Sequence, residues 1–213
     1  MIPTPITAAT YWHRSLNPKK LIETGFSSLP NNTPMARYLK IHKLPAEPSI
    51  VGMKPMEKKH VPIVHKKLNE YLKQFKLHLH FTEGEIEHFL LPREWVVESY
   101  VIEDPDTDEV TDFMSWYSLP SSVLKHETHK TLNIAYSYYY FTDKYSVGDL
   151  MKNCLILAKN KGYDVFNALD IMHNSTFVEE LKFGIGDGNL HYYLYNWRVN
   201  KIEPKDVGVV LVR

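Results

Sequence analysis

The stretch WVVESYVIEDPDTDEVTDFMSWYSL, residues 95–119, places two runs rich in β-branched and aromatic side chains on either side of a cluster of turn residues. Such side chains favour strands, and the Asp, Pro and Thr residues of 104–109 favour a short connection. Residues 95–104 and 111–119 therefore predict a β-hairpin. This hairpin indicates that an antiparallel sheet forms the core of the fold.

Helical and strand patterns alternate on both sides of the hairpin. In residues 56–75, apolar side chains recur at three- and four-residue steps, which is typical of an amphipathic helix. Further helices are expected after Asn17-Pro18, at 82–91, at 146–160 before Gly162, and at 175–183, where Thr176 and Glu179 suit a capping box. Strands are expected at 36–44, 134–141, 163–172, 190–199 and 206–213. The pattern predicts an α+β fold, a mostly antiparallel mixed sheet flanked by helices.

The composition is that of an ordinary globular protein. A chain of 213 residues is most economically one domain. Its 25 Lys and Arg residues balance 25 Asp and Glu residues, so the net charge does not indicate a nucleic-acid partner. No apolar run reaches the ~18 residues of a transmembrane helix. The single Cys154 fits a reducing, cytoplasmic compartment, and residues 1–10 are expected to be an extended entry strand or linker.

The stretch KFGIGDGNLHYYLYNW, residues 182–197, contains three glycines within five positions. A phosphate-binding loop requires a helix after its glycines, whereas here the expected helix comes before them and an aromatic strand pattern follows. We therefore expect a glycine turn between a helix and a strand, with Asp187 at its tip.

Histidine is the first candidate for metal chemistry, since the chain has eleven of them. His78 and His80 would share one face of a strand, near Glu85 and His88. No Cys pair and no H-E-x-x-H spacing accompanies them, so we expect solvated side chains and no metal site.

The candidates for a nucleophile lack the surroundings that would activate them. Ser121 has no G-x-S-x-G elbow, and Cys154 lies on the apolar side of a helical pattern without a nearby base. The residues by themselves therefore indicate a fold but no reaction.

Five motifs, taken together and in order, resemble the C-terminal half of the N-myristoyltransferase family. They are TYWHRSLNPKKL (10–21), HFLLPRE (88–94), TDFMSWYSLPSSV (111–123), GYDVFNALDIM (162–172) and LKFGIGDGNLHYYLYNW (181–197). The family's enzyme has two GNAT-like lobes, of which the first binds myristoyl-CoA and supplies the oxyanion hole. The resemblance implies that residues 1–213 correspond to the second, peptide-binding lobe and that most of the first lobe is absent from this sequence.

The resemblance also assigns residues to a peptide groove. His13 matches a histidine that binds a substrate side chain near its fifth residue, and Asp187 matches an aspartate that faces basic residues further along the peptide. The other matched groove positions are Tyr11, Ser121, Tyr136, Asn167, Leu169, Gly188 and Leu190.

The implied reaction moves a myristoyl group from myristoyl-CoA, a co-substrate, to the amine of an N-terminal glycine. That amine, with a pKa of ~8, must lose a proton before it attacks. In the family the C-terminal carboxylate of the chain is the base, and the family's last residue matches Val212. Arg213 adds one residue, and a strand advances ~3.3 Å per residue, so the register of this carboxylate is expected to shift.

Three interpretations stay open at this point. The chain supplies the peptide-binding half of an N-myristoyltransferase, with glycine-initiated peptides as partners. Alternatively, it is a non-catalytic peptide-binding or regulatory module derived from that enzyme. A third interpretation is an incomplete gene product whose other half lies elsewhere.

Overall fold

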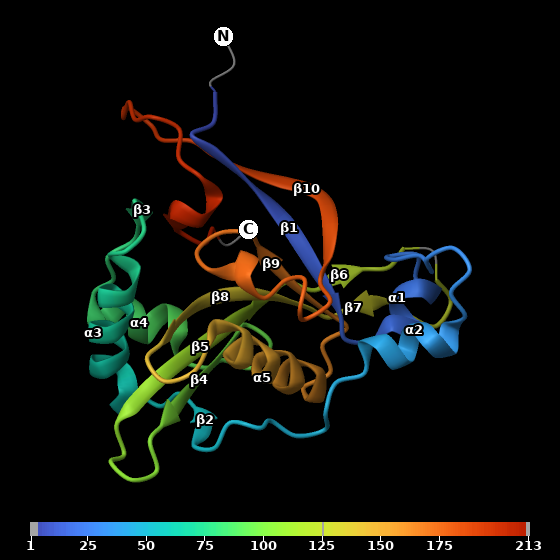
Figure 1. Cartoon of the computed structure of the whole chain (residues 1–213), viewed down its shortest axis with the longest axis horizontal. Coiled ribbons are helices and arrows are strands. Elements are labelled where there is room, and N and C mark those ends of the chain that lie inside the picture. The colour runs from blue at the N-terminus through green and yellow to red at the C-terminus, as the bar shows by residue number, and fades with distance from the viewer. Residues whose placement is uncertain (1–3, 125, 212–213) are drawn as a thin grey trace.

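The computed structural model describes residues 4–124 and 126–211. Its main feature is a sheet of seven strands in the order β10-β1-β9-β8-β5-β4-β2 (Figure 1). Only β8 and β9 run parallel in this sheet; its other neighbouring strands are antiparallel. The strands are β1 (Thr7–Ser15), β2 (Met53–Pro55), β4 (Val97–Glu103), β5 (Val110–Ser118), β8 (Ile134–Thr142), β9 (Val165–Leu169) and β10 (Gly184–Tyr192).

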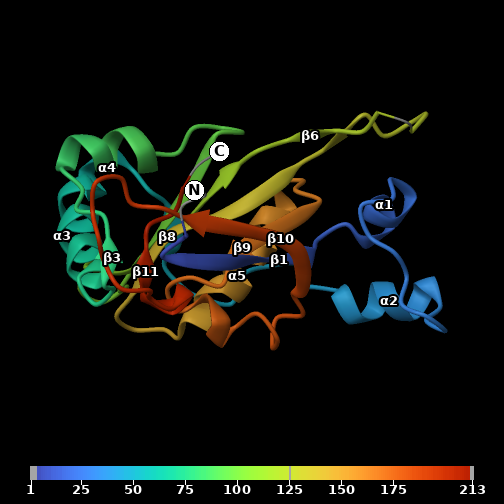
Figure 2. The same ribbon diagram turned by 90° about the horizontal axis from the view of Figure 1, so that it is seen from above.

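The helices gather at the two ends of the molecule and along the sheet. Figures 1 and 2 show α3 and α4 at one end, α1 and α2 at the other, and α5 between them. The α-helices are α1 (Pro18–Glu23), α2 (Met35–His42), α3 (Val61–Leu72), α4 (Glu83–Leu90) and α5 (Val147–Asn160). The shorter elements are η1 (Lys58–His60), η2 (Asn174–Thr176), η3 (Pro204–Asp206), and the paired strands β3 (Leu77–His78) with β11 (Val207–Gly208) and β6 (Ser121–Ser122) with β7 (Thr131–Leu132).

The core lies on the β4-β5-β8 part of the sheet. These strands are buried along nearly their whole length, which requires cover on both faces. Both α3 and α5 contact β5 and β8. By contrast, side chains of β10 alternate between exposed and half-buried, so the β10-β1 end of the sheet is left more open to solvent.

Most of the predicted elements are confirmed. The hairpin of residues 95–119 is the β4-β5 pair, and β8, β9, α1, α3, α4 and α5 lie where the sequence placed them. The local signals act as expected: Asn17 and Ser146 cap α1 and α5, and Thr82 forms a capping box with Glu85 at α4. Gly162, with φ of 86°, follows α5.

Two predicted elements are wrong. The strand expected at 36–44 is helix α2, which begins directly after Pro34 and has no buried residue. The helix expected at 175–183 is the 3-10 turn η2 followed by single turns that end at Lys182, with φ of 62°. Thr176 donates to the carbonyl of His173 instead of capping a helix with Glu179.

The chain's first and last strands differ in extent from the predictions. The expected entry at residues 1–10 becomes β1 from Thr7 onward, and residues 1–3 lie outside the described part. The strand expected at 190–199 starts earlier, at Gly184, and ends at Tyr192. Of the strand expected at 206–213, the structure describes residues 206–211, and among these only Val207 and Gly208 pair, with β3.

Tyrosine side chains fix the path of the segment after β11. Tyr192 Oη donates to the carbonyl of Val209 at 2.8 Å, and the N–H of Val210 donates to Tyr139 Oη at 3.0 Å. Tyr139 is completely buried, and its burial raises the pKa of its hydroxyl. The hydroxyl therefore stays protonated and uncharged, and its oxygen accepts the hydrogen bond from Val210.

No helix within the described residues is long and apolar enough to cross a membrane. The finding applies to residues 4–124 and 126–211.

We predict that Tyr139→Phe lowers the free energy of unfolding by about 1–3 kcal/mol, because the buried N–H of Val210 loses its acceptor. Urea unfolding measures this change. Tyr138→Phe is the matched control, since Tyr138 is also buried but makes no hydrogen bond through its hydroxyl to the described residues. Equal losses for the two variants would contradict the role given to Tyr139.

Candidate functional site

His13 and Asn167 form the polar centre of the open end of the sheet. They face each other across the β1-β9 pair, and His13 Nδ1 lies 2.6 Å from Asn167 Oδ1. Because the amide oxygen only accepts, the histidine must carry its proton on Nδ1. In the neutral ring, Nε2 is then left as an acceptor for a ligand's hydroxyl or N–H group.

Strand β10 bulges where it passes this histidine. Between the pairs Thr10–Asn189 and Trp12–Ile185, two residue steps of β1 are opposed by four steps of β10. The predicted glycine turn is therefore wrong: Gly186, Asp187 and Gly188 form a bulge inside an edge strand. Among the described glycines, positive φ angles occur at Gly25, Gly52 and Gly162, not at these positions.

Close contact explains why glycine occupies position 186. A Cβ atom there would lie 2.4 Å from His13 Nε2 and 2.9 Å from the carbonyl oxygen of Tyr11. Position 188 is less crowded, with the nearest atom, Tyr11 Cδ2, at 3.5 Å. Gly186 therefore permits the close packing of β10 against β1, and the bulge presents Asp187 beside His13.

Tyrosines form the neighbouring part of the site. Tyr11 pairs with Leu169 across β1 and β9, and its ring meets that of Tyr136 edge-on at 6.4 Å. Tyr136 also pairs with Asn167 across β8 and β9. A small cavity of about 10 Å³, here called the inner hollow, is lined by these four residues and by Val210 from the C-terminal segment.

A second hollow of about 970 Å³ continues from His13 toward α2, and we call it the α2 hollow. Its walls are the end of β1, residues 26–28, the end of α2, Glu179 and residues 182–187. Figures 1 and 2 show α1 and α2 beyond the end of the β1-β10 pair. Asp187 is exposed and has no ion-pair partner among the described residues.

Arg14 and His42 fix the helix that forms the far wall of this hollow. The Arg14 guanidinium donates to His42 Nδ1 at 2.7 Å, to the His42 carbonyl at 3.2 Å and to the Ser15 carbonyl at 2.6 Å. Burial, together with the adjacent Arg14 charge, lowers the pKa of His42 to about 4. Burial also lowers the pKa of Arg14 to about 10, so at neutral pH Arg14 is charged and His42 is neutral.

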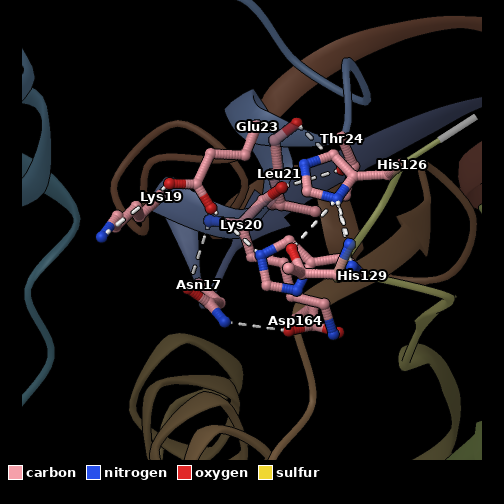
Figure 3. Close-up of polar contacts among 10 residues, drawn as sticks. Asn17, Lys19, Lys20, Leu21, Glu23, Thr24, His126, His129 and Asp164 are labelled. Atoms are coloured by element: carbon pink, nitrogen blue, oxygen red, sulfur yellow. Dashed lines mark hydrogen bonds and ion pairs between the residues drawn. The ribbon is translucent and has the colours of Figure 1, made fainter.

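Ser121 lies apart from the other predicted groove residues. It lines a hollow of about 440 Å³ beside the β6-β7 hairpin, and among the described residues only Phe26 lines both this hollow and the α2 hollow. Figure 3 shows how the hairpin meets α1: His129 contacts Glu23 at 3.0 Å and stacks on His126.

The base of α1 is anchored separately. Lys20 donates to the buried carboxylate of Asp164 at 2.6 Å, and Asn17 donates to the same side chain at 3.0 Å (Figure 3). These contacts fix α1 on the sheet, and with it the loop that carries Phe26.

The structure thus brings together most of the residues that sequence reasoning assigned to a groove. They lie on the adjacent strands β10, β1, β9 and β8: Tyr11, His13, Tyr136, Asn167, Leu169, Asp187, Gly188 and Leu190, the last of which pairs with Ala9. The assigned Val212 and Arg213 lie outside the described residues. Sequence reasoning missed Tyr38, His42 and Glu179, because only the folded chain places them near His13.

The side chains considered as metal ligands include two, His78 and Glu85, that contact their own neighbours in the sequence. Glu85 accepts from the Thr82 backbone and hydroxyl, and His78 Nδ1 contacts the carbonyl of Phe75. Within residues 4–124 and 126–211, no group of three or more His, Cys, Asp or Glu side chains is arranged to hold a metal ion. Cys154 is buried, and its burial raises the pKa of the thiol, which disfavours the reactive thiolate.

Comparison with known proteins gives consistent matches. The family model for the C-terminal domain of myristoyl-CoA:protein N-myristoyltransferase matches residues 23–210. Glycylpeptide N-tetradecanoyltransferase 1 of Arabidopsis thaliana is 52% identical over 213 residues, which are 100% of this chain and 49% of the relative. Glycylpeptide N-tetradecanoyltransferase 2 of Bos taurus is 48% identical over 211 residues, which are 99% of this chain and 42% of the relative. The chain therefore spans about half the length of these relatives.

Solved structures agree with these matches. Saccharomyces cerevisiae N-myristoyltransferase with bound myristoyl-CoA superposes with a TM-score of 0.94 at 34% identity, covering 100% of this chain and 56% of that one. A GCN5-related N-acetyltransferase from Anabaena variabilis, 11% identical with a TM-score of 0.52, covers 88% of this chain and 40% of its own length. This second likeness concerns the fold alone. The predicted α+β, GNAT-like fold is confirmed.

We predict that Gly186→Ala weakens the binding of any ligand that contacts His13, because the new methyl group displaces the imidazole. Gly184→Ala is the matched control, since its Cβ would meet nothing closer than 4.0 Å. The chemical shifts of the His13 ring, followed by NMR, report the displacement directly. An unchanged His13 environment in Gly186→Ala would contradict the crowding argument.

We also predict that acidification weakens the attachment of α2. His42 has a pKa of about 4 when folded and an ordinary value of 6.5, so the unfolded chain binds more protons between these values. The stability contributed by neutral His42 is therefore complete above pH 6.5 and lost as the pH falls toward 4.

His42→Asn tests this pH dependence, because the amide oxygen can still accept from Arg14 but does not titrate. Urea unfolding between pH 7.5 and 4.5 should show the wild type losing more stability than the variant. Parallel pH profiles for the two proteins would rule out His42 as the titrating group.

Proposed function

The chain belongs to the myristoyl-CoA:protein N-myristoyltransferase family, and from this premise we propose that it supplies the peptide-binding half of an enzyme that myristoylates N-terminal glycines. One observation carries the proposal. His13 contacts Asn167 at the open end of the sheet, His13 and Asp187 line the α2 hollow, and Asn167 lines the inner hollow. A groove of this kind suits an extended peptide.

The proposed peptide starts near the inner hollow and runs past His13 into the α2 hollow. Tyr11, Tyr136 and Leu169 surround its first residues, which favours the small glycine, since these side chains leave a cavity of only about 10 Å³. His13 Nε2 accepts a hydrogen bond from a substrate hydroxyl near the fifth residue. Asp187 attracts basic side chains that follow.

The proposed reaction forms an amide bond and breaks a thioester bond. The uncharged glycine amine attacks the thioester carbonyl of myristoyl-CoA, the CoA thiolate leaves, and the amine gives up its proton to a base. We propose a carboxylate at the C-terminal end, after Val212 or Arg213, as this base. The fixed path of Val209 and Val210, which brings the segment to the inner hollow, supports this assignment.

The myristoyl-CoA site is proposed to lie mainly in the other half of the enzyme. An exposed apolar patch, formed by Tyr193, Tyr195, Trp197 and Val199, supports a contact with that half. Tyr195 is 92% exposed and Trp197 is 72% exposed, and such patches mark surfaces that pack against another protein part. The buried, unreactive Cys154 accords with a reducing compartment, and we propose the cytoplasm as the place of action.

Isothermal titration with glycine-initiated peptides tests the proposed function. A peptide with a free glycine amine and a Lys after its fifth residue should bind. Its N-acetylated counterpart should bind more weakly, because the acetyl group enlarges the N-terminus that must fit at the inner hollow. Equal affinities for the two peptides would contradict a groove that recognises the N-terminus.

We predict that Asp187→Asn weakens the binding of the basic peptide by about 0.2–1 kcal/mol, the range for an exposed ion pair. The affinity for a neutral analogue should stay almost unchanged. The loss should shrink as salt is added, since exposed charges are screened. If both peptides lose affinity equally, Asp187 maintains the shape of the bulge and does not attract the basic side chain.

A further inference from the structure

The α2 hollow has a second acidic side chain in addition to Asp187. Glu179 lines the same hollow, from the turns that precede β10. Neither carboxylate has an ion-pair partner among the described residues. Among the described residues, Lys182 is the one lining side chain with a fixed positive charge, so the two carboxylates outnumber it.

The remaining walls of the hollow suit the stem of a long basic side chain. Phe26 and Ile41 are 40% and 47% exposed, and Tyr38 packs against the ring of His42 at 4.4 Å. Lys and Arg side chains lay their methylene groups along such apolar surface and keep the charged head in water. A cation over an aromatic face is attracted further by the ring.

The hollow lies where residues beyond the fifth of a bound peptide would lie. His13 and Ser15 are on the same face of β1, two residues apart, so Ser15 is ~7 Å further along the strand. An extended peptide covers that distance in two residues. A chain that passes His13 therefore reaches α2 and Glu179 within its next few residues.

We propose that Glu179 is a specificity-determining residue of the peptide groove, which binds a second basic side chain downstream of the one that Asp187 attracts. This inference rests on the proposed function. The preferred substrates are glycine-initiated chains with two basic residues after the position read by His13. Arg is favoured over Lys at the Glu179 position, because its planar head also stacks on aromatic rings.

The experiment uses glycine-initiated peptides about ten residues long, with one Arg moved through each position from the sixth onward in a neutral background. Affinities are measured for the wild type, Glu179→Gln and Asp187→Asn. Glu180→Gln is the matched control, because Glu180 is the adjacent exposed carboxylate and does not line the hollow.

Glu179→Gln should weaken binding about two- to fivefold when Arg is at one or two positions, and leave the other peptides unchanged. Asp187→Asn should affect a different, earlier position, and Glu180→Gln none. If the peptides bind but Glu179→Gln and Glu180→Gln change their affinities alike, the role proposed for Glu179 is overturned and the proposed function still stands. If no peptide with a free glycine amine binds better than its acetylated form, the proposed function fails, and this inference fails with it.

Discussion

The antiparallel pairing of β1 on both of its edges is the constraint on which the site depends. β1 pairs with β9 on one side and with β10 on the other. Without this pairing, β10 would have no partner in the sheet, and His13 would lose its contacts with Asn167 and with the bulge at Gly186. A strand near the start of the sequence thus joins two that lie more than a hundred residues later.

Local signals in the sequence were sufficient for elements whose pattern reflects their burial. The hairpin of β4 and β5, helix α3 and helix α5 have periodic apolar side chains that face the core, so their type could be predicted. Helix α2 lacks such a face, because none of its residues is buried, and its aromatic and β-branched side chains suggested a strand. The turns at 175–183 have helical composition but only local hydrogen bonds.

The site could be predicted only in part, because its geometry is set by long-range pairing. Three closely spaced glycines are compatible with a turn or with a bulge, and the choice depends on His13, which lies far away in the sequence. The resemblance to the family predicts His13, Asn167 and Asp187 as groove residues, and the structure places them on adjacent strands. The family motifs gave no indication of the bond between Arg14 and His42, since nothing local connects these positions.

The distribution of charge supports the proposed preference of the groove for cations. Elsewhere in the chain, carboxylates are mostly engaged: Asp164 by Lys20, Glu98 by Lys161 and Glu103 by Lys54. Arg14, a cation of β1 that does not line the α2 hollow, is buried and directed to the carbonyl at the C-terminal end of α2, where the helix dipole favours it. Arg14 is thus held by backbone carbonyls and His42, and it forms no ion pair with Asp187 or Glu179. Under the proposed function, an incoming basic peptide meets two carboxylates that need not first release an internal ion-pair partner.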